Sequence, residues 1–269
     1  MKEKFTVALL FFCCLVPHLA GASSDPLPFQ VGEKSTYNLR WGMVHAGTAE
    51  LAVLPMAEFK GRKAWRFSLS VRTNKFLDKI YKVRDRIDSY AALDLDSSLL
   101  YTKVQNEGDS HRRVRVDFDQ AAQTAQYSNK GKSRDPIEIM PGTMDPLTIL
   151  FYSRAQDLSK INEVRRPITD GKRNMTGLAR VVGRERLEVN GVTYDTIVVE
   201  PDLRDVRGVF EKSKGTKTTL WFTNDDRRLL VRVASKVRVG SFVADLIPQV
   251  RSGDMLAAVD RKVMSGEGD

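Results

Sequence analysis

Residues 229–246 read LLVRVASKVRVGSFVADL, and nearly every second position along them carries a valine or a serine. This period of two is typical of a half-buried β-strand, because successive side chains of a strand point to opposite faces. We therefore expect one strand here, with cations on the face opposite the valines. The valine and serine face comprises Val231, Val233, Ser235, Val237, Val239, Ser241 and Val243, and the cations are Arg232, Lys236 and Arg238.

The same period recurs along the chain, for example in residues 37–41, 65–71 and 114–118. Turn-forming residues separate such runs, which favours antiparallel strands joined by hairpins. Asn190-Gly191 is typical of a two-residue hairpin turn, and such a turn would place Val189 opposite Val192. The other turn sequences are Glu107-Gly108-Asp109, Asp170-Gly171 and Asn224-Asp225-Asp226.

One segment, PGTMDPLTILFYSRAQDL, predicts a helix over about 145–158. Asp145 can accept hydrogen bonds from the free backbone donors of a first turn, and Pro146 suits the first helical position. The apolar residues Leu147, Leu150, Phe151 and Leu158 recur on one side, which we expect to pack on the sheet. A shorter helical piece is expected over 74–79.

These patterns predict a mainly β protein: a single large curved antiparallel sheet, an open or half-closed barrel, wrapped around one or two short helices. The sequence contains no long linker rich in proline, glycine or serine and no repeat of fixed period. We therefore expect one domain over 23–251, with residues 252–269 as a flexible or short helical tail.

The first 22 residues have the pattern of a secretory signal, with Lys2 and Lys4 before an apolar run and Ala20-Gly21-Ala22 after it. We expect cleavage after Ala22 and a periplasmic protein with no transmembrane segment in the mature chain. Both cysteines, Cys13 and Cys14, lie inside this signal, so the mature chain would have neither disulfides nor thiolate metal sites. The formal net charge of +9 drops by one with removal of the signal and attracts anionic surfaces weakly.

Motifs that carry chemistry are scarce. Gly131-Lys132-Ser133 resembles the end of a phosphate-binding loop but lacks its upstream glycine, and Ser110 lies between two strands rather than before a helix. Only His45 and His111 remain after removal of the signal, each beside a turn. We therefore predict a non-enzymatic protein with no catalytic residues, no metal site and no cofactor.

The alternating cations have two interpretations. Arg232, Lys236 and Arg238 could keep the outer face of the sheet soluble and form ion pairs with nearby carboxylates. They could instead form a basic patch that binds lipid phosphate, lipopolysaccharide or an acidic glycan. Nucleic acid is not an expected partner, because the sequence contains none of the aromatic and basic motifs of the known binding folds.

The inward aromatic residues also have two interpretations. If the sheet curls, Trp41, Trp65, Phe67, Phe118, Phe151 and Trp221 would converge under the helix. They could form a plain hydrophobic core, or they could line an apolar cavity that is open at one end. The pattern alone does not separate the two.

Seven consecutive blocks of the chain read YNLRWGMVHAGTAEL, KAWRFSLSVRT, YKVRDRIDSYAALD, RVRVDFD, PGTMDPLTILFYSR, GRERLEVNGVTYDTIVVEP and LWFTNDDRRLLVRVASKVRVGSF. In this order they resemble the exported bacterial proteins of domain-of-unknown-function family 3108, over about Val31 to Leu246. The resemblance implies a periplasmic or outer-membrane-associated β protein without assigned catalytic residues. More distantly, the expected fold is similar to that of the periplasmic lipoprotein carriers, whose concave apolar face holds acyl chains.

Our leading hypothesis is a periplasmic binding or envelope-maintenance protein that shelters an acyl chain or another apolar ligand in its concave sheet. The aromatic residues would contact the apolar part, and the three cations would contact an anionic envelope component. The alternative is a structural interaction protein that supports an envelope component and has no small-molecule ligand. An enzyme would need a cleft with two carboxylates, or one carboxylate with tyrosine and arginine. The sequence predicts no particular oligomeric state.

Overall fold

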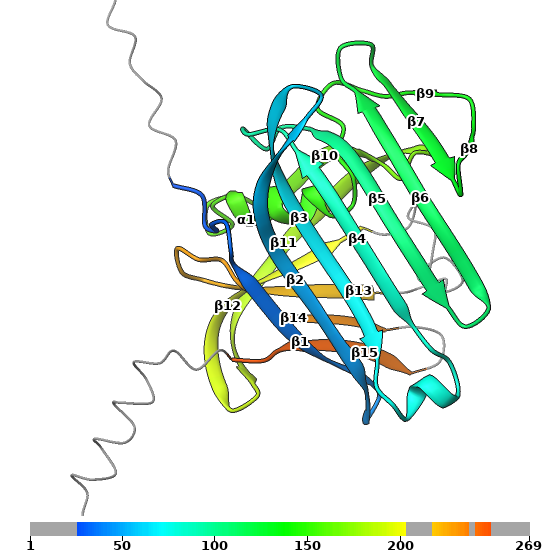
Figure 1. Ribbon diagram of the computed structural model, residues 1–269. Coiled ribbons are helices and arrows are strands. Elements are labelled where there is room, and N and C mark those ends of the chain that lie inside the picture. Colours follow the sequence, from blue (N-terminus) through cyan, green and yellow to red (C-terminus); the bar gives the residue numbers. More distant parts are fainter. Residues whose placement is uncertain (1–25, 203–216, 237–239, 249–269) are drawn as a thin grey trace, which may run out of the picture.

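The computed structural model describes residues 26–202, 217–236 and 240–248. Fifteen strands and two short helices make up this part of the chain (Figure 1). In chain order they are β1 (Lys34–Trp41), β2 (Val44–Phe59), β3 (Arg62–Thr73), the 3₁₀ helix η1 (Leu77–Lys79), β4 (Arg84–Ala91), β5 (Ser98–Glu107), β6 (Ser110–Asp119), β7 (Thr124–Asn129), β8 (Lys132–Ser133), β9 (Ile137–Glu138), α1 (Thr148–Ala155), β10 (Glu163–Thr169), β11 (Asn174–Val189), β12 (Val192–Pro201), β13 (Lys217–Thr223), β14 (Leu230–Lys236) and β15 (Ser241–Leu246). The predicted signal segment 1–22, the tail 252–269 and Arg238 lie outside the described residues.

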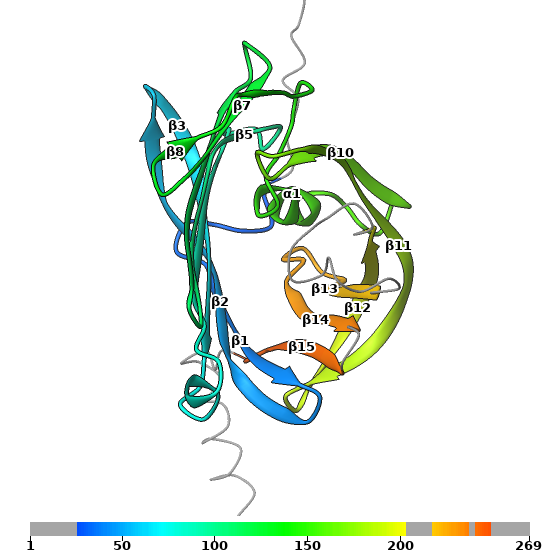
Figure 2. The same ribbon diagram turned by 90° about the vertical axis from the view of Figure 1, so that its right-hand side faces the viewer.

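All fifteen strands belong to one sheet, in the order β10-β11-β12-β13-β14-β15-β1-β2-β3-β4-β5-β6-β7-β8, with β9 paired to β7. Every paired strand is antiparallel to its neighbour. The pairing of β15 with β1 joins the last described strand to the first, so the N-terminal and C-terminal halves form one continuous surface. The sheet curls so that its two halves face each other as two walls (Figure 2). The predicted fold class is therefore confirmed.

The curled sheet is not closed by a strand ladder, but the segment between β9 and α1 crosses from one edge to the other. At one edge β9 pairs with β7. At the other edge Met144 forms a parallel bridge with Ile168 of β10. The Met144 amide donates to the Pro167 carbonyl (2.9 Å), and the Thr169 amide donates to the Met144 carbonyl (2.9 Å). We call this crossing segment, residues 137–144, the seam.

The helix α1 is shorter than the sequence predicts. It covers Thr148–Ala155 and ends where Gln156 adopts an extended conformation (ψ 145°). Its first turn is capped as expected, because Asp145 Oδ1 accepts hydrogen bonds from the amides of Leu147 (2.8 Å) and Thr148 (3.0 Å). Leu158 lies beyond the helix but is still buried, so the predicted apolar side continues into the loop that follows.

The hairpin predicted at Asn190-Gly191 is confirmed. Both residues have positive φ, 50° and 80°, as a two-residue turn of this kind requires. Val189 lies opposite Val192 in the β11–β12 ladder, and Leu187 lies opposite Tyr194.

The prediction of a single strand over residues 229–246 is wrong. The segment forms two antiparallel strands, β14 and β15, and Gly240 with φ 80° lies between them. In this hairpin Val243 lies opposite Ala234, not on the face of Val231 and Val233. The period of two continues through the turn, so alternation alone did not reveal the reversal of the chain.

A buried arginine ties the helix to both halves of the molecule. The Arg154 side chain is almost fully buried and forms an ion pair with Glu33 (2.7 Å). Its Nε donates to the carbonyl of Arg228 (3.0 Å), and its Nη2 donates to the carbonyl of Arg227 (3.0 Å). The cation thus joins the segment before β1 and the β13–β14 turn to α1, and every one of its partners accepts a hydrogen bond.

Candidate functional site

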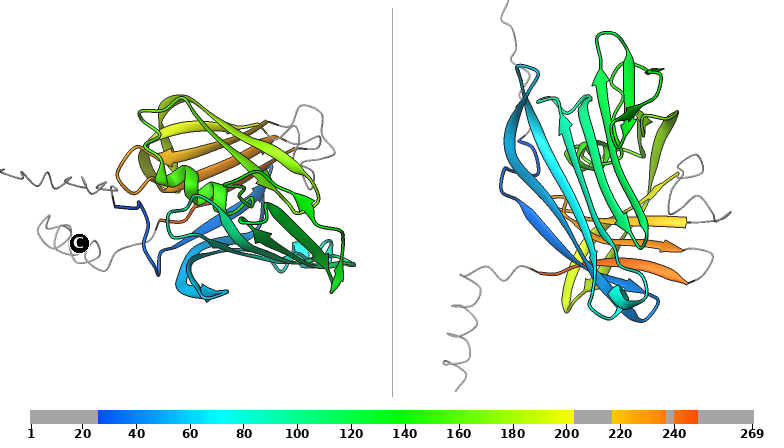
Figure 3. Two further views of the ribbon diagram at one scale, coloured as in Figure 1. Left: turned by 90° about the horizontal axis from the view of Figure 1, so that it is seen from above. Right: turned by 45° about the vertical axis from the view of Figure 1, so that its right-hand side comes forward.

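The inner face of the curled sheet is the candidate site. Seen from above (Figure 3, left panel), β10–β15 form one wall and β1–β7 form the other, with α1 between them. In Figure 2 the helix lies toward one end of the space between the walls, and the β1–β2 turn and η1 lie at the opposite end. We call these the helix end and the open end.

At the helix end, aromatic rings pack tightly against each other. Phe67 of β3 stacks on Phe151 of α1, with ring centroids 3.8 Å apart and planes 9° apart. Phe29 meets both rings edge-on, at 5.7 Å and 5.3 Å, and Trp65 stacks on Phe67 at 6.3 Å. Phe67 and Phe151 are fully buried. Three of the six candidate aromatic residues are therefore brought together, and they form part of a filled core.

Phe29 completes this cluster, and no sequence pattern predicts its place there. It precedes the first strand, in the segment PLPFQ, where no apolar period exists. Its only sequence signal is an isolated aromatic residue that follows two prolines, Pro26 and Pro28.

The other three aromatic candidates lie elsewhere, so the six do not converge under the helix. Trp41 is at the open end, 42% exposed, and stacks on Phe242 with centroids 6.0 Å apart. Phe118 belongs to a separate buried cluster with Tyr101, Val116, Ala125, Tyr127 and Ile139. Trp221 is only partly buried, and its Nε1 donates a hydrogen bond to Glu185. Alternation along β13 brings its neighbour Phe222 into the core instead.

The inner face away from α1 is apolar and is not fully covered. Its side chains contact the buried cluster around Phe67, but each remains partly exposed. The strand registers place Leu39, Ala244, Val233 and Leu220 in one row across β1, β15, β14 and β13. Leu69 lies opposite Leu51 on one side and Ile87 on the other. We define the uncovered inner face by these residues: Leu39, Leu69, Val71, Ile87, Leu220, Val233 and Ala244.

Of the three candidate cations, the structure describes Arg232 and Lys236. Arg232 of β14 forms an ion pair with Asp245 of β15, and Arg40 of β1 pairs with the same carboxylate at 2.5 Å. Asp245 is buried between them. Lys236 is exposed at the end of β14, opposite Ser241. Arg232 therefore makes the cross-strand ion pair that the first interpretation of these cations predicts, and an anion contact by Lys236 or Arg238 remains a prediction.

Several described titratable groups have pKa values shifted by burial. Burial raises the pKa of Asp85 above its ordinary value, and the neighbouring Glu107 carboxylate adds to the shift. Burial also raises the pKa values of Tyr37 and Tyr101, so both hydroxyls stay protonated at neutral pH. Within the described ranges, no group of three His, Cys, Asp or Glu residues is arranged to hold a metal ion. No helix there is long and apolar enough to cross a membrane.

The curled antiparallel sheet with a helix at one end defines the class of barrel-like β proteins, and comparison with solved structures agrees. A beta-barrel-like protein of domain of unknown function DUF1849 from Brucella abortus matches with a TM-score of 0.53 and 8% sequence identity. The match covers 81% of this chain and 97% of that chain, and it concerns the fold alone. Curated proteins give no significant match.

The chain belongs to the family described as protein of unknown function DUF3108, whose model matches residues 36–247. This range begins within β1 and ends just after β15, so the family corresponds to the whole described sheet. The resemblance inferred from the seven sequence blocks is thereby confirmed.

Proposed function

We propose that the protein is a non-enzymatic binding protein of the periplasm that shelters an acyl chain or a similar apolar ligand on the uncovered inner face. One observation carries the proposal. Apolar side chains from β1, β3, β4 and β13–β15 point into the barrel and contact its core, yet α1 leaves them partly exposed. Soluble proteins rarely leave such a concave apolar surface without a binding partner.

The ligand site differs from the one that the sequence suggests. The cluster of Trp65, Phe67 and Phe151 is packed and acts as the floor of the site, whereas the row of Leu39, Ala244 and Val233 forms its wall. An elongated ligand would enter at the open end and stop at the floor. The described side chains of this wall are apolar, which favours a ligand held by burial of apolar area, without a chemical step.

A binding titration tests the proposal. The mature chain, stripped of lipid by a reversed-phase step and refolded, would be titrated with a fluorescent polyene fatty acid. We expect saturable binding. Ala244→Trp would fill the wall and lower the affinity about tenfold or more, which corresponds to about 1.4 kcal/mol.

Val243→Trp is the matched control, because Val243 is the neighbour of Ala244 on the same strand and points to the outer face, opposite Arg40. Its affinity for the fatty acid should equal that of the wild type. Equal affinities for the wild type and Ala244→Trp, or no saturable binding by the wild type, would exclude the inner face as the ligand site.

A structural interaction protein is the second candidate, and the filled aromatic core at the helix end favours it. In that case the wild type would bind no fatty acid, and crosslinking in periplasmic extracts would recover one envelope protein.

Cell fractionation together with the N-terminal sequence of the mature chain tests the periplasmic location and the expected cleavage after Ala22.

A further inference from the structure

The open end of the barrel carries the most exposed apolar side chains of the described chain. Met43 in the β1–β2 turn is 99% exposed, and Phe76 and Ile80 in the loop around η1 are 64% and 71% exposed. Val44, Tyr81, Trp41 and Phe242 at this end are also exposed. In Figures 1 and 2 the β1–β2 turn and η1 both lie at the end of the molecule away from α1.

The two turns form one surface, because hydrogen bonds join them. The backbone amide of Asn74 donates to the Ala46 carbonyl (3.0 Å), and its side-chain Nδ2 donates to the His45 carbonyl (2.5 Å). The stack of Trp41 on Phe242 extends the surface to β15. We call this surface the apolar tip; it consists of Trp41, Met43, Val44, Phe76, Ile80, Tyr81 and Phe242.

Exposed lysines alternate with the apolar side chains of the tip. The loop reads KFLDKIYK over residues 75–82, and its Lys75, Lys79 and Lys82 are all exposed. Its one carboxylate, Asp78, is neutralised by Arg84 through two hydrogen bonds, at 2.9 Å and 2.5 Å. The loop therefore presents apolar side chains and positive charge together, with no unpaired negative charge of its own.

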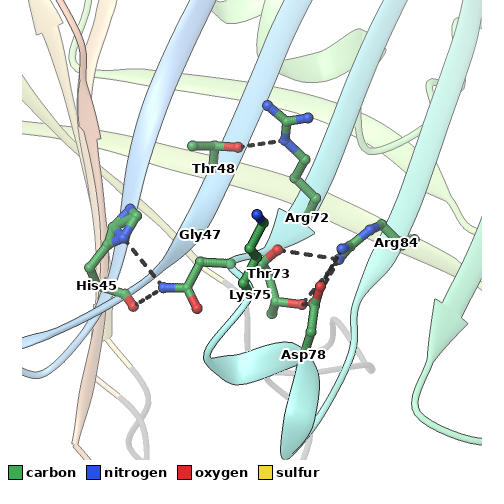
Figure 4. Close-up of a pocket in the computed structure, with 9 residues that line it drawn as sticks. His45, Gly47, Thr48, Arg72, Thr73, Lys75, Asp78 and Arg84 are labelled. Atoms are coloured by element: carbon green, nitrogen blue, oxygen red, sulfur yellow. Dashed lines mark hydrogen bonds and ion pairs between the residues drawn. The ribbon is translucent and has the colours of Figure 1, made fainter.

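A pocket of about 360 Å³ lies directly behind this loop, on the outer side of β2 and β3 (Figure 4). Its lining includes Thr48, Arg72 and Lys75. Arg72 Nε donates to Thr48 Oγ1 (3.0 Å), which fixes the guanidinium in the pocket. Among the described residues, this is the one hydrogen bond of that guanidinium, and the Lys75 ammonium makes none. Arg72 and Lys75 thus bring two cations to the lining of one pocket.

We propose that the apolar tip docks on an anionic phospholipid membrane, and that the Arg72 pocket receives a lipid phosphate. Apolar side chains on turns enter the boundary between headgroups and acyl chains, while neighbouring lysines remain at the level of the phosphates. A protein partner would bury the apolar residues equally well, but the interleaved lysines and the cationic pocket complement a layer of phosphates. The proposal deepens the proposed function, on which it rests, because docking would bring the open end of the barrel to the bilayer.

Co-sedimentation with vesicles tests the docking. The mature chain should bind vesicles of phosphatidylglycerol and phosphatidylethanolamine and should not bind phosphatidylcholine vesicles. Raising the salt from about 0.1 M to about 1 M shortens the Debye length from about 10 Å to about 3 Å, so binding should weaken. Phe76→Ser with Ile80→Ser should lower the affinity about tenfold or more, and Lys75→Gln with Lys79→Gln and Lys82→Gln should do the same.

The matched control lies away from the tip, beside the aromatic cluster, where Trp65 Nε1 donates to the Leu93 carbonyl (3.1 Å). Leu93 is 49% exposed and lines a second pocket together with Lys63, so Leu93→Ser with Lys63→Gln removes the same chemistry from a surface outside the tip. This control should bind anionic vesicles like the wild type. All substituted side chains are exposed, and unchanged melting temperatures would show that the variants fold. The proposal would be overturned if the wild type did not bind anionic vesicles, or if a tip variant bound them as well as the control does.

Two further measurements separate the related possibilities. Arg72→Gln should lower the affinity for anionic vesicles, whereas calorimetric titration with inorganic phosphate should give no saturable binding to the wild type. If the wild type binds inorganic phosphate saturably and Arg72→Gln does not, the pocket is a site for a free anion. That result would contradict the proposal that the pocket receives the phosphate of a lipid. The fatty acid titration in solution does not depend on docking. Tip variants that bind the fatty acid but lose vesicle binding would separate the two functions. A wild type that binds the fatty acid but not the vesicles would reject the docking proposal alone.

Discussion

The carboxylate of Asp145 connects several elements of this fold by hydrogen bonds. It is fully buried, and besides capping two amides of α1 it accepts hydrogen bonds from the hydroxyls of Ser89 (2.5 Å), Ser98 (2.6 Å) and Thr148 (2.7 Å). The carboxylate thereby connects the helix to β4 and β5. Its five bonds satisfy two backbone amides and three buried hydroxyls, two of which, those of Ser89 and Thr148, also contact each other.

We expect Asp145→Ala to lower the free energy of unfolding by about 3 kcal/mol or more, because the cap is lost and buried hydroxyls lose their acceptor. Urea unfolding followed by tryptophan fluorescence measures this. Asp135→Ala removes an exposed aspartate and should change the stability by less than about 0.5 kcal/mol. A similar stability for both variants would contradict the role of Asp145.

Asp88 gives the protein a predictable response to acid. Burial alone would raise the pKa of this carboxyl, but two hydrogen bonds from Arg86, at 2.8 Å and 3.0 Å, and the charge of Arg66 outweigh burial, so its pKa lies below the ordinary 3.8. The native state then holds the proton less tightly than the unfolded chain. The stabilisation is present above about pH 4 and is lost as the pH falls through the lowered pKa.

We therefore expect Asp88→Asn to melt at a lower temperature than the wild type at neutral pH, and the difference should shrink below about pH 4. Thermal melting over a series of buffers measures it. The exposed Glu58→Gln variant serves as the reference for general acid effects. A difference that stays constant down to the lowest pH would show that the ion pair with Arg86 does not stabilise the fold.

At the scale of single elements, the β2–β3 pair depends on a glycine beside the open end. Gly47 has φ 155°, and a Cβ atom there would lie 2.0 Å from the Arg72 carbonyl oxygen. We expect Gly47→Ala to separate the strands and to destabilise the protein by about 3 kcal/mol. Gly183→Ala, where a Cβ meets nothing within 4 Å, is the control and should change the unfolding midpoint little. If Gly47→Ala has the same unfolding midpoint as Gly183→Ala, the strands accommodate the added Cβ atom without loss of stability.

Sequence patterns predicted the elements better than their places in the sheet. Asn190-Gly191 specifies its hairpin locally, since both residues tolerate positive φ, and the register follows from the turn. By contrast, the run LWF at residues 220–222 is apolar on both faces, so alternation did not show that Phe222 rather than Trp221 enters the core. The helix end of the site was predictable in part, because Phe67 and Phe151 follow clear periods.

The open end of the site was not predictable, because it depends on tertiary features. Its surface depends on the pairing of β15 with β1, which brings Phe242 beside Trp41 although the two residues lie about 200 positions apart in the sequence. The apolar side chains of the tip lie in turns, where no period distinguishes them. The paired arginines Arg40 and Arg232 on Asp245 likewise required knowledge of which strands are neighbours.

At the scale of the whole molecule, the seam connects the edges of the two walls that no strand ladder joins. A ladder of long strands connects the walls through β15 and β1. At the opposite edges residues 137–144 cross from β7 to β10, and Lys172 of the β10–β11 turn lies over the Tyr127 ring of β7. Met144 is fully buried in a small cluster with Ile168 and Met175, between these edges. The width of the inner face, and with it the proposed binding surface, should therefore depend on Met144.

We expect Met144→Ala to destabilise the protein by about 2 to 5 kcal/mol, because the substitution leaves a cavity in a fully buried site. The more specific expectation concerns hydrogen exchange: the amides of Met144 and Thr169, which bond across the seam, should lose protection well before those of the β1–β2 ladder. Peptide-resolved exchange measured by mass spectrometry distinguishes the two regions. Met140→Ala, four residues earlier and exposed, should leave both regions protected. Uniform loss of protection over both regions in Met144→Ala would show instead that the curled sheet opens only as a whole, so that the seam has no separate control over the width of the barrel.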